Sequence, residues 1–165
     1  MNITNEKSIE APPEVAHKFT DSKGDEWAVA LNVSTIKAVR QHLSIDLLDL
    51  DNGKLILNLT SDPIMLVDVI YVVCMDEAEE RGVIDSEFGA RMAGDVIADA
   101  TEAMLGALVS FIPNPRDRAN MAKVLNKTHQ IMEATRDLVD KEIANGALDK
   151  IAEKAIGDLS TNSPG

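Results

Sequence analysis

An apolar run of twelve residues, Ile64 to Met75, limits what this chain can fold into more than any other feature of its sequence. The run follows Asp62-Pro63, a strong helix start, because Asp caps the first turn and Pro fits the first helical position. A helix here is apolar on almost all sides, with Asp68 its one charge, and is expected to lie inside a core. We expect it to continue to about Glu80 and to end at Gly82, a residue that suits a helix C-terminus.

Two extended runs earlier in the chain predict a β-hairpin. They are His17 to Thr20 and Trp27 to Asn32, and the turn-rich segment Asp21 to Glu26 separates them. The second run alternates, which places Val29 and Leu31 on the same face as Trp27. The edges of such a hairpin are open either to strand addition by a partner or to cover by helices of the same domain.

The remaining elements before residue 113 are shorter. Leu55 to Leu59 fits either a short strand or the start of a helix. We further expect helices over Ile36–Leu43 with Ser34-Thr35 as the cap, over Phe88–Met92 with Asp85-Ser86-Glu87 as the cap, and over Val96–Phe111 after Gly94-Asp95. The fold predicted from these patterns is α+β and mostly α.

A long amphipathic helix is predicted from Pro115 to about Ala144, where Gly146 breaks the pattern. Its apolar residues recur at spacings of three and four, with polar residues such as Thr128 and Thr135 at some positions of the stripe. This stripe either packs on the domain or binds a partner. The candidate partner-binding residues are Met121, Leu125, Ile131, Met132 and Leu138.

The domain organisation follows from these elements. Residues 1–16 are polar and contain two prolines, so we expect a flexible N-terminal segment. Residues 17–113 form a globular domain of a hairpin and helices, and residues 114–159 form a helical C-terminal extension. A short helix is expected over Ala147–Ile156, and residues 160–165 are expected to be a frayed tail.

The charge of the chain restricts its partners. The formal net charge is −12, which disfavours binding to nucleic acid and to anionic lipid, and favours partners with basic patches. No signal peptide and no apolar run long enough to span a bilayer is found in the sequence, so we expect a cytoplasmic protein. The single cysteine, Cys74, lies in the apolar run and is expected to be buried and inert.

No arrangement of residues typical of an active site is found in the sequence. The three histidines, His17, His42 and His129, lack the short spacing of metal ligands. Asp46, Asp49 and Asp51 lie close together, but the order of ligands in a calcium-binding loop is absent, so caps or turns are the better interpretation. Nucleophile elbows and phosphate-binding glycine loops are also absent. We therefore expect no catalytic residues, no metal and no cofactor, and a protein that is not an enzyme.

A series of apolar positions and turns between Phe19 and Arg116 resembles a known group of proteins. The segments that carry the resemblance are Glu26 to Val33, Ile36 to Arg40, Ile45 to Leu48, Leu59 to Pro63, Asp68 to Cys74, Arg81 to Val83, Phe88-Gly89, Met92 to Asp95 and Phe111 to Pro113. The series is similar to small proteins from the tail operons of tailed bacteriophages and prophages. These proteins are usually encoded near the tape-measure protein and are commonly regarded as tail assembly chaperones.

The resemblance implies a function without an active site. Such chaperones are held to bind the long, hydrophobic tape-measure chain before the tail tube polymerises around it, which places the protein in the host-cell cytoplasm. A chaperone of this kind often self-associates, so the stripe on residues 115–144 is expected to mediate either self-association into a homo-oligomer or client binding. The alternative from the same operon is a minor structural component of the virion, such as a connector, completion or tube-associated protein.

Overall fold

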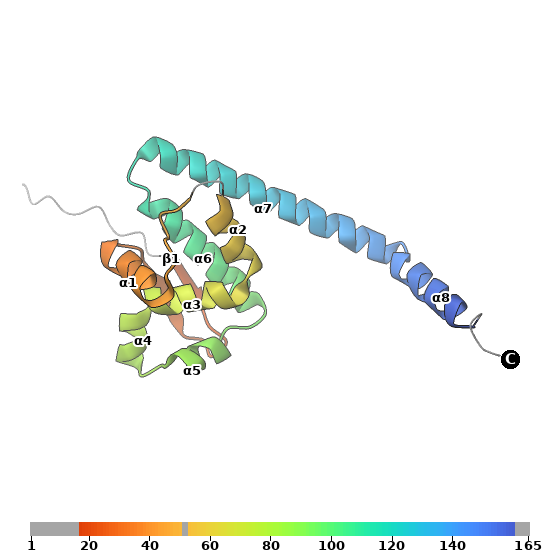
Figure 1. The fold of residues 1–165 in the computed structure, drawn as a ribbon, viewed down its shortest axis with the longest axis horizontal. Coiled ribbons are helices and arrows are strands. Elements are labelled where there is room, and N and C mark those ends of the chain that lie inside the picture. The colour runs from red at the N-terminus through yellow and green to blue at the C-terminus, as the bar shows by residue number, and fades with distance from the viewer. Residues whose placement is uncertain (1–16, 51–52, 161–165) are drawn as a thin grey trace, which may run out of the picture. The chain divides into compact units, whose positions relative to one another are not determined.

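The computed structural model describes residues 17–50 and 53–160, and its elements are drawn in Figure 1. The strands are β1 (His17–Thr20) and β2 (Glu26–Val29). The helices are α1 (Val33–Leu43), α2 (Lys54–Ser61), α3 (Pro63–Val73), α4 (Met75–Arg81), α5 (Asp85–Ala90), α6 (Asp95–Phe111), α7 (Pro115–Ala144) and α8 (Ala147–Ser160). The predicted α+β, mostly helical fold with its leading hairpin is therefore confirmed.

The chain divides into two units, Met1–Arg118 and Ala119–Gly165, and the division falls within α7. The predicted flexible segment 1–16 lies outside the described residues. So does the predicted tail, except for Ser160, which is the last residue of α8. We call Met1–Arg118 the N-terminal unit.

The hairpin pairs β1 with β2 in antiparallel register, with Phe19 opposite Trp27. The predicted second strand extended to Asn32, but β2 ends at Val29 because Asn32 starts α1 instead. The Asn32 side chain accepts hydrogen bonds from the backbone N–H groups of Ser34 and Thr35. The prediction that Ser34-Thr35 caps this helix was therefore wrong, since both residues lie in its first turn.

The predicted helix start at Asp62-Pro63 is confirmed, because Asp62 Oδ1 accepts from the N–H groups of Ile64 and Met65 at 3.0 Å. The single helix expected up to Glu80 is instead two, α3 and α4, divided at Cys74. Gly82 ends α4 with φ of +67°, as expected of a left-handed terminal position.

Two other local expectations are settled by the structure. The segment Leu55–Leu59, which fitted a strand or a helix, is part of helix α2. The expected cap Asp85-Ser86-Glu87 lies inside the first turn of α5, and Ile84 occupies the capping position without a side-chain hydrogen bond. The predicted helix over Val96–Phe111 is confirmed as α6, on which Ala100, Met104 and Leu108 are buried while Ile97 and Phe111 are half-buried.

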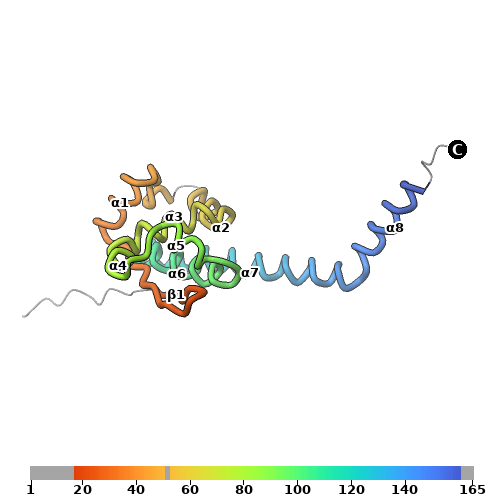
Figure 2. The backbone as a smooth tube through the Cα atoms, turned by 90° about the horizontal axis from the view of Figure 1, so that it is seen from below, coloured from red at the N-terminus to blue at the C-terminus, as the bar shows by residue number. Residues whose placement is uncertain are grey.

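The core of the N-terminal unit gathers around α3 and α6. Figure 2 shows the hairpin on one side of this unit and α1 and α2 on the other, with α3 and α6 between them. The largest fully buried side chains are Trp27, Leu47, Leu59, Leu66, Ile70, Phe88 and Met104. Trp27 meets the ring of Phe88 edge-on, at 4.9 Å between centroids. Within residues 17–50 and 53–160, only two pairs of aromatic rings are in contact. Aliphatic side chains therefore fill most of the core.

Among the helices of residues 17–50 and 53–160, none by itself is long and apolar enough to cross a membrane. Helices α2 and α3 reach that length and composition only when taken together, and they are bent by 102° at the break between them.

Candidate functional site

Helix α7 carries all five residues that the sequence indicated as partner-binding. The helix begins at Pro115, where the backbone N–H of Arg116 donates to Asn114 Oδ1 at 2.9 Å, and it runs to Ala144 as predicted. Gly146 then adopts a φ of +79°, a conformation that ends helices and that side chains other than glycine rarely adopt.

The apolar residues of α7 form one stripe, which we call the α7 stripe. Its members are Met121, Val124, Leu125, Ile131, Met132, Leu138, Val139 and Ile143. Positions three and four apart lie on the same side of a helix, so these residues share one face. Met121 and Leu125 are half-buried, whereas the other six are exposed, from 40% for Met132 to 63% for Leu138. No residue of α7 is buried.

Two threonines within the α7 stripe interrupt it less than their polarity suggests. Thr128 Oγ1 donates to the carbonyl of Val124 at 3.0 Å, and Thr135 Oγ1 donates to the carbonyl of Ile131 at 2.8 Å. Each hydroxyl is thus satisfied by the backbone one turn earlier, and its methyl group remains for apolar contact. The sequence pattern counted both positions as polar members of the stripe, and the hydrogen bonds show that each hydroxyl is directed to the backbone.

Helix α8 carries a second apolar stripe that was not among the predicted sites. Leu148, Ile151, Ile156 and Leu159 recur at helical spacing, and each is more than half exposed. The signal was present in the sequence as apolar residues three and five positions apart, but the segment was expected only as a short helix over Ala147–Ile156.

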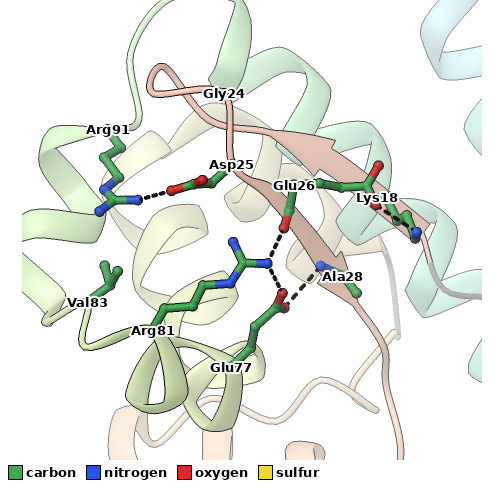
Figure 3. A pocket seen from close by; sticks show the side chains of 9 residues that line it. All are labelled: Lys18, Gly24, Asp25, Glu26, Ala28, Glu77, Arg81, Val83 and Arg91. Atoms are coloured by element: carbon green, nitrogen blue, oxygen red, sulfur yellow. Dashed lines mark hydrogen bonds and ion pairs between the residues drawn. The ribbon is translucent and has the colours of Figure 1, made fainter.

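The N-terminal unit contains an open pocket of about 560 Å³ beside β2, and Figure 3 shows its lining side chains. Its cations are paired with its own carboxylates. Lys18 meets Glu26 at 2.7 Å, Arg91 meets Asp25 at 2.7 Å, and Arg81 meets Glu77. Because these charges neutralise one another inside the pocket, the lining offers little net charge for a ligand.

The same region covers the outer edge of β2. The backbone N–H of Ala28 donates to Glu77 at 3.3 Å, and Arg81 donates to the carbonyl of Glu26 at 2.7 Å. Cys74 Sγ donates to the carbonyl of Ala28 at 3.5 Å. On the other side of the hairpin, α6 packs along β1. Of the two possibilities left open by the sequence, cover by the same domain therefore describes the β2 edge of this hairpin.

A third feature is a groove of about 370 Å³ lined by parts of α3, α5 and the start of α6. Val67 and Met92 contribute to its apolar lining, and Asp68 and Asp85 contribute carboxylates. Burial raises the pKa of Asp68, and the charges of Asp85 and Asp62 raise it further. A raised carboxyl pKa is a common feature of acid–base sites, but no histidine, lysine or cysteine lines this groove.

Two residues considered as a possible metal ligand or nucleophile, Asp46 and Cys74, have contacts that stabilise the fold. Asp46 accepts from the N–H of Leu48 and pairs with Arg40 at 2.8 Å, so it stabilises a turn. Cys74 is buried, and burial raises the pKa of its thiol to about 12. Over residues 17–50 and 53–160, no three His, Cys, Asp or Glu side chains gather closely enough to hold a metal ion.

No protein-family model, no curated protein and no solved structure matches the chain.

Proposed function

We propose that this chain is a tail assembly chaperone of a tailed bacteriophage or prophage. It binds the hydrophobic tape-measure protein in the host-cell cytoplasm while the tail is built, and it acts without catalysis. The proposal rests on two observations. Residues 19–116 resemble small tail-operon proteins, and helix α7 has an exposed apolar face.

The observation that carries the proposal is the contrast between the two units. The N-terminal unit buries most of its large apolar residues in one core, and its exposed ones, Val33, Leu48, Leu57, Ile64 and Ile84, lie on several elements. Helix α7 buries none, although it carries eight apolar residues on one face. Exposed apolar faces of this extent are typical of surfaces that bind other proteins.

The character of the stripe also suits a client with varied apolar segments. Met121 and Met132 have flexible, polarizable side chains that adapt to different partners. The chain as a whole is acidic, with a net charge of −12, which keeps a complex of such segments dispersed.

Co-expression of the full chain with the tape-measure protein encoded beside it tests the proposal. We expect a recoverable complex and more tape-measure protein in the soluble fraction. The double variant Leu125→Asp/Ile131→Asp, which places two charges in the stripe, should lose both effects. The matched control Asn126→Asp/Gln130→Asp places two charges on the other side of α7 and should retain them. If the client remains equally soluble without the chain, and no complex is recovered, the proposal fails.

Mass spectrometry of purified particles separates the chaperone from a structural component of the virion. A chaperone leaves before the tail is complete, so we expect the chain to be absent from mature particles. Its presence in stoichiometric amount would overturn the proposal in favour of a connector, completion or tube-associated protein.

A further inference from the structure

The residues that border the α7 stripe are basic on both edges. Lys127 and Lys141 each lie three positions after an apolar member of the stripe, so they border one edge. His129 and Arg136 each lie three positions before an apolar member and border the other edge. Ala122 and Ala134 occupy the remaining border positions between residues 121 and 139.

Between Met121 and Val139, the acidic residues of α7 lie elsewhere on the helix. Glu133 and Asp137 fall on the side away from the stripe, and Glu133 lies 3.5 Å from His129. Asp140 lies three positions before Ile143 and borders the stripe only beyond Val139. Glu142 falls within the stripe, but only in the last turn of the helix. From Met121 to Val139 the apolar surface is therefore bordered by cations and neutral residues alone.

This basic border stands out because the chain as a whole is acidic. Residues Met1–Arg118 hold ten Lys and Arg against 21 Asp and Glu, whereas residues Ala119–Gly165 hold six against seven. Nearly all of the excess negative charge thus belongs to the N-terminal unit. Bordering charges determine which helix an apolar helix face accepts, because opposite charges attract across the seam and like charges repel.

We propose that the α7 stripe binds an amphipathic helix of a partner whose own apolar face is bordered by Asp and Glu. The inference rests on the proposed function, since it specifies the kind of tape-measure segment that the stripe accepts. A helix fits because the stripe repeats every seven residues over roughly 27 Å, the length of 18 helical steps, and such a repeat matches another helix.

A second copy of α7 does not supply this complement. Side by side in parallel, two copies would place Lys127 and Arg136 against the basic borders of the other copy. In antiparallel orientation the borders between residues 121 and 139 again offer no carboxylate. The charges therefore disfavour pairing of two α7 helices and favour a partner with acidic borders.

Two synthetic helical peptides test the inference on the full chain. Both have four heptads with Leu and Ile at the core positions, and they differ only in carrying Glu or Lys at the bordering positions. We expect the Glu peptide to bind at least about tenfold more tightly than the Lys peptide in about 100 mM salt, where charges still act over ~10 Å. The preference should weaken as salt is added. Equal binding of the two peptides, binding of neither, or tighter binding of the Lys peptide would overturn the inference.

Reversal of two border charges on α7 is the second test of the inference. The variant Lys127→Glu/Arg136→Glu should exchange the preference and bind the Lys peptide more tightly. The matched control Lys37→Glu/Lys150→Glu makes the same change in net charge away from α7 and should keep the original preference. Circular dichroism of both variants verifies that the helices remain. A control that exchanges its preference as well would show that net charge alone decides binding, which would overturn the inference.

Light scattering of the chain without peptide decides whether a second copy is the occupant. A dimer that dissociates in the variant Leu125→Asp/Ile131→Asp would show that the stripe is an interface between copies, and the inference would be wrong. Co-expression and peptide binding test the two proposals separately. A tape-measure complex without peptide selectivity would contradict the acidic-helix inference alone, and peptide selectivity without a tape-measure complex would contradict the proposed function alone.

Discussion

Arg91 and Asp21 form a buried ion pair although 70 residues separate them in the chain, with Arg91 Nη1 donating to Asp21 Oδ2 at 3.1 Å. The same carboxyl oxygen accepts from the indole N–H of Trp27 at 2.9 Å. The other oxygen accepts from the backbone N–H groups of Lys23 and Asp25. One carboxylate thereby holds the hairpin loop, the central tryptophan and the end of α5 together.

Removal of this carboxylate should destabilise the N-terminal unit strongly. Asp21→Ala leaves the Trp27 N–H without its acceptor and takes one partner from a buried guanidinium, so we expect a loss of about 3 kcal/mol in the free energy of unfolding. Asp21→Asn keeps an acceptor oxygen and should cost less. Urea titration followed by Trp27 fluorescence measures both.

Lys18→Ala is the control for this variant, because it removes an ion pair that is exposed on both sides. It should leave the urea midpoint almost unchanged. Equal effects of Asp21→Ala and Lys18→Ala would show that the buried pair does not hold the hairpin in place.

Gly106 is required where α6 passes β1. A Cβ at this position would lie 2.5 Å from Nδ1 of His17, whose Nε2 is hydrogen-bonded to Ser110 Oγ at 2.8 Å. Gly106→Ala should therefore displace the half-buried ring and lower stability by about 1–3 kcal/mol, as an added atom at a close contact does. Thermal denaturation measures the loss.

Gly89 in α5 provides the matched control, because a Cβ there meets no atom within 4 Å. Gly89→Ala should leave stability unchanged or raise it by about 0.5–1 kcal/mol, since alanine favours helix. The double variant His17→Ala/Gly106→Ala should be less impaired than expected from the two single losses. Strict additivity would show that the ring is not what Gly106 accommodates.

Asp68 should make stability depend on pH in an unusual direction. Burial, Asp85 and Asp62 raise its pKa in the folded chain above the ordinary value of 3.8. Its ionisation therefore favours the unfolded chain, and the stability present below pH 3.8 is lost as the pH rises through the folded pKa. Asp68→Asn should raise the melting temperature by a few degrees at neutral pH and should have no such effect at about pH 3, below the unfolded pKa. A larger gain at acidic than at neutral pH would contradict this assignment.

Cys74 should react only when the chain unfolds. Its side chain is buried and its thiol pKa is raised to about 12, so the fraction of reactive thiolate at neutral pH is minute. We expect native protein to resist alkylation for hours and denatured protein to react at once. Rapid alkylation of native protein, as rapid as in denaturant, would contradict the buried position of Cys74.

Local signals in the sequence predicted most elements, and the misplaced boundaries have identifiable causes. The helix start at Asp62-Pro63 was predicted correctly, because the Asp62 cap and Pro63 at the first helical position both act within one turn. Near residue 33, three good caps stand close together, and Asn32 prevails since Thr35 Oγ1 also accepts from its backbone N–H in a reciprocal capping box. This box joins residues only three positions apart, so the signal that selects Asn32 is local.

Features that depend on distant contacts were not predictable in this way. The division of the expected long helix at Cys74 accompanies a hydrogen bond from its thiol to the carbonyl of Ala28, on a strand 46 residues earlier. The Asp21–Arg91 pair is likewise invisible without the fold. On α7, by contrast, periodicity sufficed to place the helix and its stripe, because both are properties of one continuous segment.

The cover over the outer edge of β2 bears on how copies of this protein behave when crowded. A two-stranded sheet with a bare edge is a template on which other chains can add strands and grow cross-β fibrils, or exchange hairpins between copies. Here an incoming strand would first have to displace Arg81 from the carbonyl of Glu26 and Glu77 from the N–H of Ala28. The β2 edge thus resists fibril formation and hairpin exchange, so copies can reach high concentration without this edge seeding aggregation.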